Sequence, residues 1–174
     1  MKKITLISGG SRSGKSSYAL DIASEYDKRG FIATAIPFDD EMKKRIKNHQ
    51  AERENKFVTV EEPHNLAEAI TDLQDDVNVI IIDCISVWLG NLLFKHGETK
   101  NKFDEVNKFL NRLNKINCDI IIVTNEVGMG IIPDNKLARH YRDIAGFINQ
   151  QIAKFAHEVI LMISGIPLKI KELK

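Results

Sequence analysis

The sequence predicts an α/β fold in which a mostly parallel β-sheet is packed between layers of helices. Short aliphatic runs alternate along the chain with segments whose apolar residues recur every three or four positions, a pattern typical of strand–helix–strand units. Two runs, at 79–82 and 120–123, are aliphatic throughout, as expected of strands buried on both faces of a parallel sheet. A glycine-rich stretch joins the first run to the first helical segment, a position at which α/β folds bind phosphate.

Seven segments are expected to be strands because they are short and rich in aliphatic or β-branched residues. Gly30 precedes the second segment and Pro37 follows it, while Gly165 and Pro167 separate the last two. The final segment is expected to be an edge strand. In chain order, strands are predicted at 4–7, 31–35, 57–60, 79–82, 120–123, 159–163 and 168–170.

The segments between these strands carry the apolar stripes of amphipathic helices. Asp39 or Asp40 can cap one helix, Pro63 stands at the start of the next, and the longest stripe runs from Leu137 to Phe155. Helices are predicted at 16–28, 40–53, 63–73, 86–94, 103–113 and 135–155.

Size and composition favour one soluble domain over residues 1–174, since no linker, internal repeat or low-complexity tract divides the 174 residues. Lys and Arg number 25 against 24 Asp and Glu, which gives no support to a nucleic-acid-binding surface. Cys84 and Cys118 flank expected buried strands and are predicted to be buried free thiols. The start of the chain does not resemble a signal peptide, and no apolar run approaches a membrane span, so a cytoplasmic location is expected.

The glycine-rich stretch has the spacing of a Walker A phosphate loop: Gly9, four residues, then Gly14, Lys15 and Ser16. Glycine lets the backbone bend tightly and approach a phosphate closely, and the loop N–H groups then point at the anion. Lys15 can reach the β- and γ-phosphates, and the Ser16 hydroxyl can hold Mg²⁺. The fold class predicted by this loop and the alternating strands is a P-loop NTPase-like, RecA-like three-layer sandwich that binds a nucleoside triphosphate.

Asp83 ends the aliphatic run 79–82, which is the expected Walker B position of an acid that holds Mg²⁺ or its water. Ligands of open parallel sheets bind beyond the carboxyl ends of the strands, where Ser8, Asp83 and Thr124 are expected. The alternative is that Asp83 caps the following helix.

His49 lies on the predicted 40–53 helix, on the face that also carries Met42 and Ile46. Arg45 and Arg53 stand four residues on either side of it, and their charges can neutralise a phosphate that the imidazole attacks. The alternative is an ordinary polar or half-buried histidine, and the residues alone leave both readings open.

Other polar residues at strand ends have two readings each. Thr34 can face a nucleotide or pack in the core, and Glu61 and Glu62 can be site residues or exposed acids. Asn125 and Glu126 follow the strand that ends in Thr124, where polar groups face the ligand cleft.

Five stretches together resemble the bifunctional adenosylcobinamide kinase / adenosylcobinamide-phosphate guanylyltransferase family of cobalamin biosynthesis. The most specific are Asp-Asp-Glu-Met-Lys-Lys-Arg-Ile-Lys-Asn-His at 39–49 and the stretch at 124–146, which begins Thr-Asn-Glu-Val-Gly-Met-Gly. The others are the phosphate loop at 9–16, Ile-Ala-Thr at 32–34 and Asn-Leu-Leu-Phe at 91–94.

This resemblance implies two activities: phosphorylation of adenosylcobinamide by ATP or GTP, and transfer of GMP from GTP to adenosylcobinamide phosphate. It implies that His49 attacks the α-phosphate and carries the GMP, that Lys15 acts in the kinase step, and that Ser16 and Asp83 hold Mg²⁺. It also implies a homotrimer. The nucleotide-binding residues that it implies are Gly9, Gly10, Ser11, Arg12, Ser13, Gly14, Lys15, Ser16, Ala33, Thr34, Ala35, Gln50, Ala51, Glu52, Arg53, Glu61 and Asp83.

Two other hypotheses remain. An ordinary P-loop small-molecule kinase would use Lys15 and Asp83 and give His49 no role. A nucleotide-dependent regulatory module would bind or hydrolyse nucleotide and recognise a macromolecule, although the near-neutral charge disfavours nucleic acid as the partner.

Overall fold

The computed structural model describes residues 2–37, 40, 43–44, 56–97 and 102–173. Of the predicted helix at 40–53, only residues 40, 43 and 44 are described. His49 lies outside the described residues.

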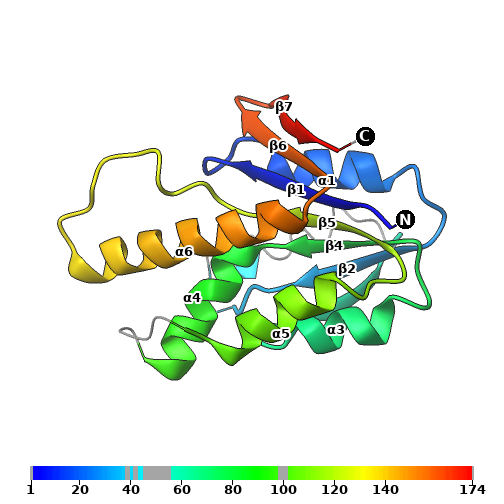
Figure 1. The fold of residues 1–174 in the computed structure, drawn as a ribbon, viewed down its shortest axis with the longest axis horizontal. Helices are drawn as coiled ribbons and strands as arrows, with labels where there is room; N and C mark the ends of the chain where they lie inside the picture. The colour runs from blue at the N-terminus through cyan, green and yellow to red at the C-terminus, as the bar shows by residue number, and fades with distance from the viewer. Residues whose placement is uncertain (1, 38–39, 41–42, 45–55, 98–101, 174) are drawn as a thin grey trace.

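One seven-stranded sheet runs through the described part of the chain, in the order β3-β2-β4-β5-β1-β6-β7 (Figure 1). Every neighbouring pair is parallel except β6 and β7, which are antiparallel at one edge. The predicted mostly parallel α/β fold is therefore confirmed. The strands are β1 (Ile4–Gly9), β2 (Arg29–Ala33), β3 (Val58–Glu61), β4 (Val79–Asp83), β5 (Asp119–Val123), β6 (Glu158–Ile163) and β7 (Ile166–Glu172).

Helices cover both faces of the sheet, which makes the three layers (Figure 1). On one face α1 packs through Ala19 and Ala23, and on the other the remaining described helices bury a larger core around Trp88 and Phe109. Side chains alternate between the two cores along the central strands, as Leu6 and Ile7 of β1 do. The described helices are α1 (Lys15–Ala23), α3 (Leu66–Leu73), α4 (Ile85–His96), α5 (Asp104–Leu113) and α6 (Lys136–Phe155).

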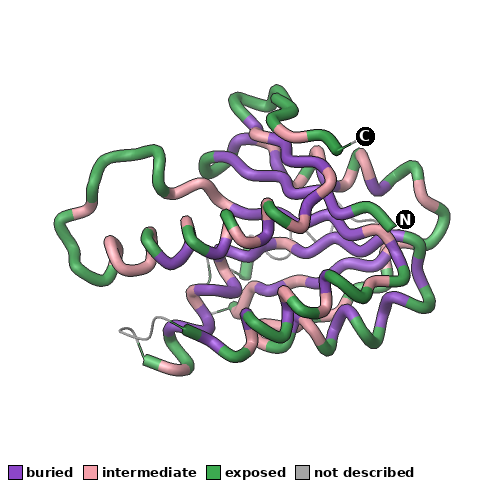
Figure 2. The backbone as a smooth tube through the Cα atoms, viewed as in Figure 1, coloured by how far each residue is buried: buried purple, intermediate pink, exposed green. Residues whose placement is uncertain are grey.

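The middle of the sheet is its most buried part (Figure 2). Residues 80–82 of β4 and 120–122 of β5 are at most 2% exposed, as their aliphatic runs predicted. Cys84 and Cys118 are buried free thiols, which confirms that prediction. No helix in the described segments is both long and apolar enough to cross a membrane.

The first helix is shorter than predicted: it ends at Ala23, whereas the prediction placed its end near residue 28. The Ser24 hydroxyl donates to the Asp21 carbonyl (2.6 Å), so a side chain satisfies a carbonyl at the helix end. The Arg29 guanidinium then donates to the carbonyls of Tyr26 (2.5 Å) and Ser24 (2.9 Å), which fixes the turn into β2. At the other end of the chain, β7 is longer than the predicted 168–170.

Candidate functional site

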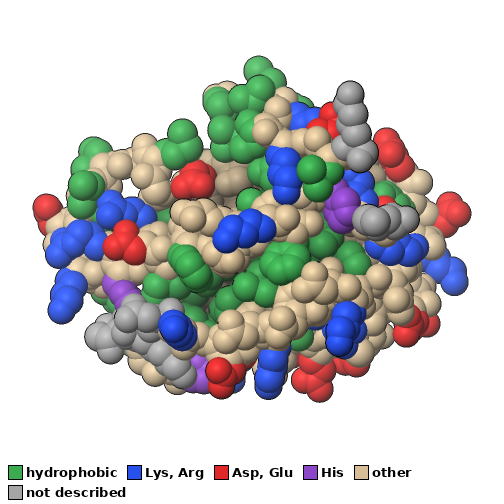
Figure 3. Space-filling view, in the orientation of Figure 1, with side chains coloured by type: hydrophobic (Ala, Val, Ile, Leu, Met, Phe, Trp, Pro, Cys, Tyr) green, Lys and Arg blue, Asp and Glu red, His purple; other side chains and the backbone are tan. Residues whose placement is uncertain are grey.

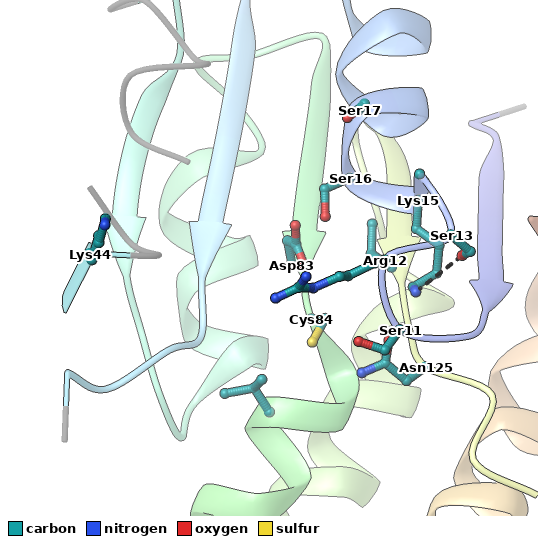
Figure 4. Close-up of a pocket in the computed structure, with 13 residues that line it drawn as sticks. Ser11, Arg12, Ser13, Lys15, Ser16, Ser17, Lys44, Asp83, Cys84 and Asn125 are labelled. Atoms are coloured by element: carbon teal, nitrogen blue, oxygen red, sulfur yellow. Dashed lines mark hydrogen bonds between the residues drawn. The ribbon is translucent and has the colours of Figure 1, made fainter. Parts of the chain in front are cut away.

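The strand order brings three polar residues together at the carboxyl ends of neighbouring strands. β5 lies between β1 and β4, and all three are parallel, so Ser8, Asp83 and Thr124 lie at the same end of the strands, as expected. A pocket of about 490 Å³ opens there (Figure 4). Its walls come from the phosphate loop, the end of β4, the start of α4 and the segment after β5, and include Arg12, Lys15, Ser16, Asp83, Cys84, Val87 and Asn125.

Backbone geometry makes glycine necessary at two points of the phosphate loop. Gly9 has φ +152°, and a Cβ there would lie 2.5 Å from the Met162 carbonyl oxygen and 2.7 Å from Ser13 Oγ. Gly14, with φ +92°, turns the chain into α1. The Gly165 N–H donates to the Ser13 carbonyl (3.1 Å), so the β6–β7 turn braces the loop from behind.

Lys15 begins α1 and lies along the inside of the loop. Its ammonium group donates to the Gly10 carbonyl (2.5 Å) and to Ser13 Oγ (3.4 Å), and the residue is 6% exposed. The N–H groups of a helix N-terminus favour an anion, and a buried cation beside them adds to that preference. This end of the pocket therefore suits phosphate.

Ser16 and Asp83 come from different elements and face the same space. Figure 4 shows the Ser16 hydroxyl pointing toward the Asp83 carboxylate, and Arg12 extending from the loop toward Asp83 and Cys84. A hydroxyl and a carboxylate are hard oxygen donors of the kind that Mg²⁺ prefers. The donor set therefore fits a magnesium ion.

Thr34 is fully buried and its hydroxyl binds the backbone beside Asp83. It donates to the Cys84 carbonyl (2.9 Å) and accepts from the Cys84 N–H (2.8 Å). The Asn91 side chain in turn donates to the Thr34 carbonyl (2.8 Å). The side chain of Thr34 thus fixes the chain that carries Asp83.

A second polar network holds Asn125 at the pocket wall. Its N–H donates to Ser86 Oγ (2.6 Å), and the Asn149 amide donates to its carbonyl (3.3 Å). The Thr124 hydroxyl donates to Asn149 Oδ1 (2.8 Å), and Tyr141 donates to the Ser86 carbonyl (2.9 Å). The sequence indicated Asn125 by its place after a strand, but it gave no sign of the partners on α4 and α6.

Cys84 lies in the pocket but is unsuited to act as a nucleophile. Burial raises the pKa of its thiol to about 12, and the neighbouring Asp83 charge adds to the effect. The thiol is therefore protonated near pH 7, and the thiolate is the nucleophilic form of cysteine.

The remaining predicted site residues are spread over the strand ends. Ala33 and Ala35 are half-buried at the end of β2, and Glu61 is exposed at the end of β3. His49 and residues 50–53 lie outside the described residues. Lys44, five positions before His49, lines the pocket.

Comparison with known proteins identifies relatives over almost the whole chain. The family model described as cobinamide kinase / cobinamide phosphate guanyltransferase matches residues 5–170. The bifunctional adenosylcobalamin biosynthesis proteins CobU of Salmonella typhimurium and Escherichia coli are 40% and 38% identical, and each alignment covers 95% of this chain and 98% of the relative. CobP of Pseudomonas aeruginosa is 37% identical, with 95% and 96% covered.

Solved structures with little sequence similarity share the fold. An ATPase of a type III secretion system has a TM-score of 0.58 at 12% identity, over 92% of this chain and 52% of that chain. The RadB recombinase has a TM-score of 0.52 at 15% identity, over 91% and 73%. These likenesses confirm the P-loop NTPase-like fold.

The contacts of Gly9 predict that a methyl group at this position disrupts the phosphate loop. In Gly9→Ala the new Cβ would clash with backbone at Met162, so we expect affinity for GTP, measured by calorimetry, to fall about tenfold or more. Gly10→Ala is the matched control, because a Cβ there meets nothing within 4 Å. Equal affinities in the two variants would contradict this account of the loop.

The Thr34 hydrogen bonds predict that Thr34→Val destabilises the protein by about 1–3 kcal/mol, since it leaves the buried N–H and carbonyl of Cys84 without their partner. Urea denaturation measures the change. Thr34→Ser should retain most of the stability. Thr71→Val, which removes an exposed hydroxyl that donates to the Ala67 carbonyl, should cost far less, and a similar loss in both valine variants would refute the role of burial.

Proposed function

The chain belongs to the cobinamide kinase / cobinamide phosphate guanyltransferase family, and on that basis we propose how its residues divide the two reactions of a bifunctional enzyme of cobalamin biosynthesis. The enzyme phosphorylates adenosylcobinamide with ATP or GTP and transfers GMP from GTP to the product, giving adenosyl-GDP-cobinamide. The observation that carries the assignment of residues is the pocket in which the phosphate loop faces Asp83.

In the kinase step, the aminopropanol hydroxyl of adenosylcobinamide attacks the γ-phosphorus. The bond from that phosphorus to the bridging oxygen breaks, the nucleoside diphosphate leaves, and the proton of the hydroxyl is released to water. Lys15 and the loop N–H groups hold the phosphate oxygens, and their positive charge offsets the negative charge that develops. Mg²⁺ held by Ser16 and Asp83 would supply further charge neutralisation.

In the guanylyl transfer, an imidazole nitrogen of His49 attacks the α-phosphorus of GTP and pyrophosphate leaves. The phosphate of adenosylcobinamide phosphate then attacks the same phosphorus and releases the histidine. Lys44, which lines the pocket, stands five positions before His49 in the sequence. This short separation supports the proposal that His49 reaches a nucleotide bound there.

We also propose that the enzyme is a trimer, as its family resemblance implies. The β6–β7 hairpin exposes apolar side chains that suit an interface: Ile163 and Leu168 are each 52% exposed and Ile166 is 69% exposed. Figure 3 shows hydrophobic side chains gathered over this hairpin at the top of the molecule.

Sedimentation velocity tests the oligomeric state. We expect a trimer for the wild type and a shift toward monomer for Leu168→Asp, because the interface would have to bury a carboxylate. Val58→Asp changes a similarly exposed residue on β3, at the opposite edge of the sheet, and should leave the trimer intact. A monomeric wild type would refute the proposal.

The role of His49 predicts that His49→Ala abolishes covalent labelling of the protein by GTP that carries a labelled α-phosphate. The bond formed is a phosphoramidate, so the wild-type label should be stable in alkali and lost in acid. Gel autoradiography after each treatment measures it.

His64→Ala is the matched control for this labelling. The His64 backbone carbonyl accepts from Trp88 Nε1 and its N–H donates to Glu62, so removing the side chain keeps both hydrogen bonds and labelling should survive. Retained phosphorylation of cobinamide by His49→Ala would show that the variant is folded. Phosphorylation by the wild type without any covalent label would favour the simple kinase instead.

A further inference from the structure

A second hollow lies beside the nucleotide pocket, between α4, the first half of α6 and the 126–135 segment that leads into α6. We call it the α4–α6 groove; its volume is about 610 Å³. Figure 1 shows this segment, drawn in yellow, arching away from the sheet before α6 begins. The walls are mostly apolar and include Leu93, Phe94, Val127, Pro133, Leu137 and Tyr141.

The groove is continuous with the nucleotide pocket along two elements. On α4, Val87 lines the pocket while Gly90 and Phe94 line the groove, and residues three and seven positions apart share one face of a helix. After β5, Asn125 lines the pocket and Val127 lines the groove. With a rise of 1.5 Å per residue, Val87 and Phe94 are about 10 Å apart along the helix axis.

The chemistry of the two hollows is complementary. The nucleotide pocket is lined by hydroxyl, ammonium, guanidinium and carboxylate groups and suits phosphates and their metal. The acceptor is a large, flat macrocycle with amide arms, and its hydroxyl-bearing arm must reach the phosphates. The groove offers such a molecule apolar walls, two aromatic side chains, Phe94 and Tyr141, and donors for amide oxygens in Asn135 and Arg142.

We propose that the α4–α6 groove binds the corrin ring of cobinamide and cobinamide phosphate, with the aminopropanol arm running along α4 into the nucleotide pocket. This inference rests on the proposed function and gives it an acceptor site. The groove explains how one anchored acceptor presents first a hydroxyl and then a phosphate to nucleotide bound at the phosphate loop.

The test places a carboxylate on the groove wall in two variants, Phe94→Asp and Leu137→Asp. The matched control is Ile131→Asp, because Ile131 is an apolar residue of the same 126–135 segment that is 94% exposed and does not line the groove. We expect the KM for cobinamide to rise at least about tenfold in both groove variants and to stay near the wild-type value in the control. Labelling by GTP, which needs no acceptor, shows that each variant is folded.

A direct binding measurement uses Trp88, the single tryptophan of the chain, which lies fully buried on α4. Cobinamide absorbs where tryptophan emits, so binding should quench Trp88, with free tryptophan as the correction for absorbed light. The Kd should rise at least about tenfold in Leu137→Asp and not in Ile131→Asp.

Three results would overturn the inference. Groove variants with wild-type KM and Kd for cobinamide would show that the ring binds elsewhere, while the proposed function stands. Groove variants with unchanged cobinamide affinity and altered sedimentation would make the groove an interface between copies of the chain. A wild-type protein that neither phosphorylates nor binds cobinamide would remove the proposed function itself.

Discussion

The hydrogen-bonded strand order β4-β5-β1 is the constraint on which the site depends. Because β5 separates the strand of the phosphate loop from the strand of Asp83, the two lie about 9.6 Å apart across the sheet, twice the spacing of neighbouring strands. That gap is where the pocket opens, and its floor is the end of β5. The buried aliphatic runs of β4 and β5 hold this spacing, since each strand is paired on both sides and covered on both faces.

Hydrogen bonds from neighbouring residues fix the site residues around this gap. Thr34 and Asn91 fix the backbone after Asp83, Ser86 and Asn149 fix Asn125, and Gly165 braces the loop at Ser13. Positioning of this kind lowers the cost of organising charges during reaction. Under the proposed function, one anchored triphosphate serves two reactions, and the attacking group determines which phosphorus reacts.

Sequence patterns predicted the parts of the molecule that depend on local spacing. The phosphate loop, the aliphatic strands and the acid at the end of β4 all follow from residues close together in the chain. The end of α1 at Ala23 is also local, but it accompanies side-chain hydrogen bonds from Ser24 and Arg29 to nearby carbonyls, which the spacing of apolar residues does not indicate. The Thr34 hydroxyl donates to the carbonyl of Cys84, which is 50 residues further along the chain, and only the folded sheet brings the two groups together. The nucleophilic role of His49 stays a prediction.

The pairing of β1 has a consequence for how the protein is made. The start of β1 is hydrogen-bonded to residues far along the chain. The Lys3 N–H donates to Asp119, 116 residues away, and the Ile4 N–H donates to His157, 153 residues away. The ribosome therefore releases the phosphate loop well before these partners, and its strand can gain both neighbours only when β6 has emerged. Nucleotide binding thus depends on residues that are synthesised long after the phosphate loop, and a translation product that ends before Gly165 would lack the brace on that loop.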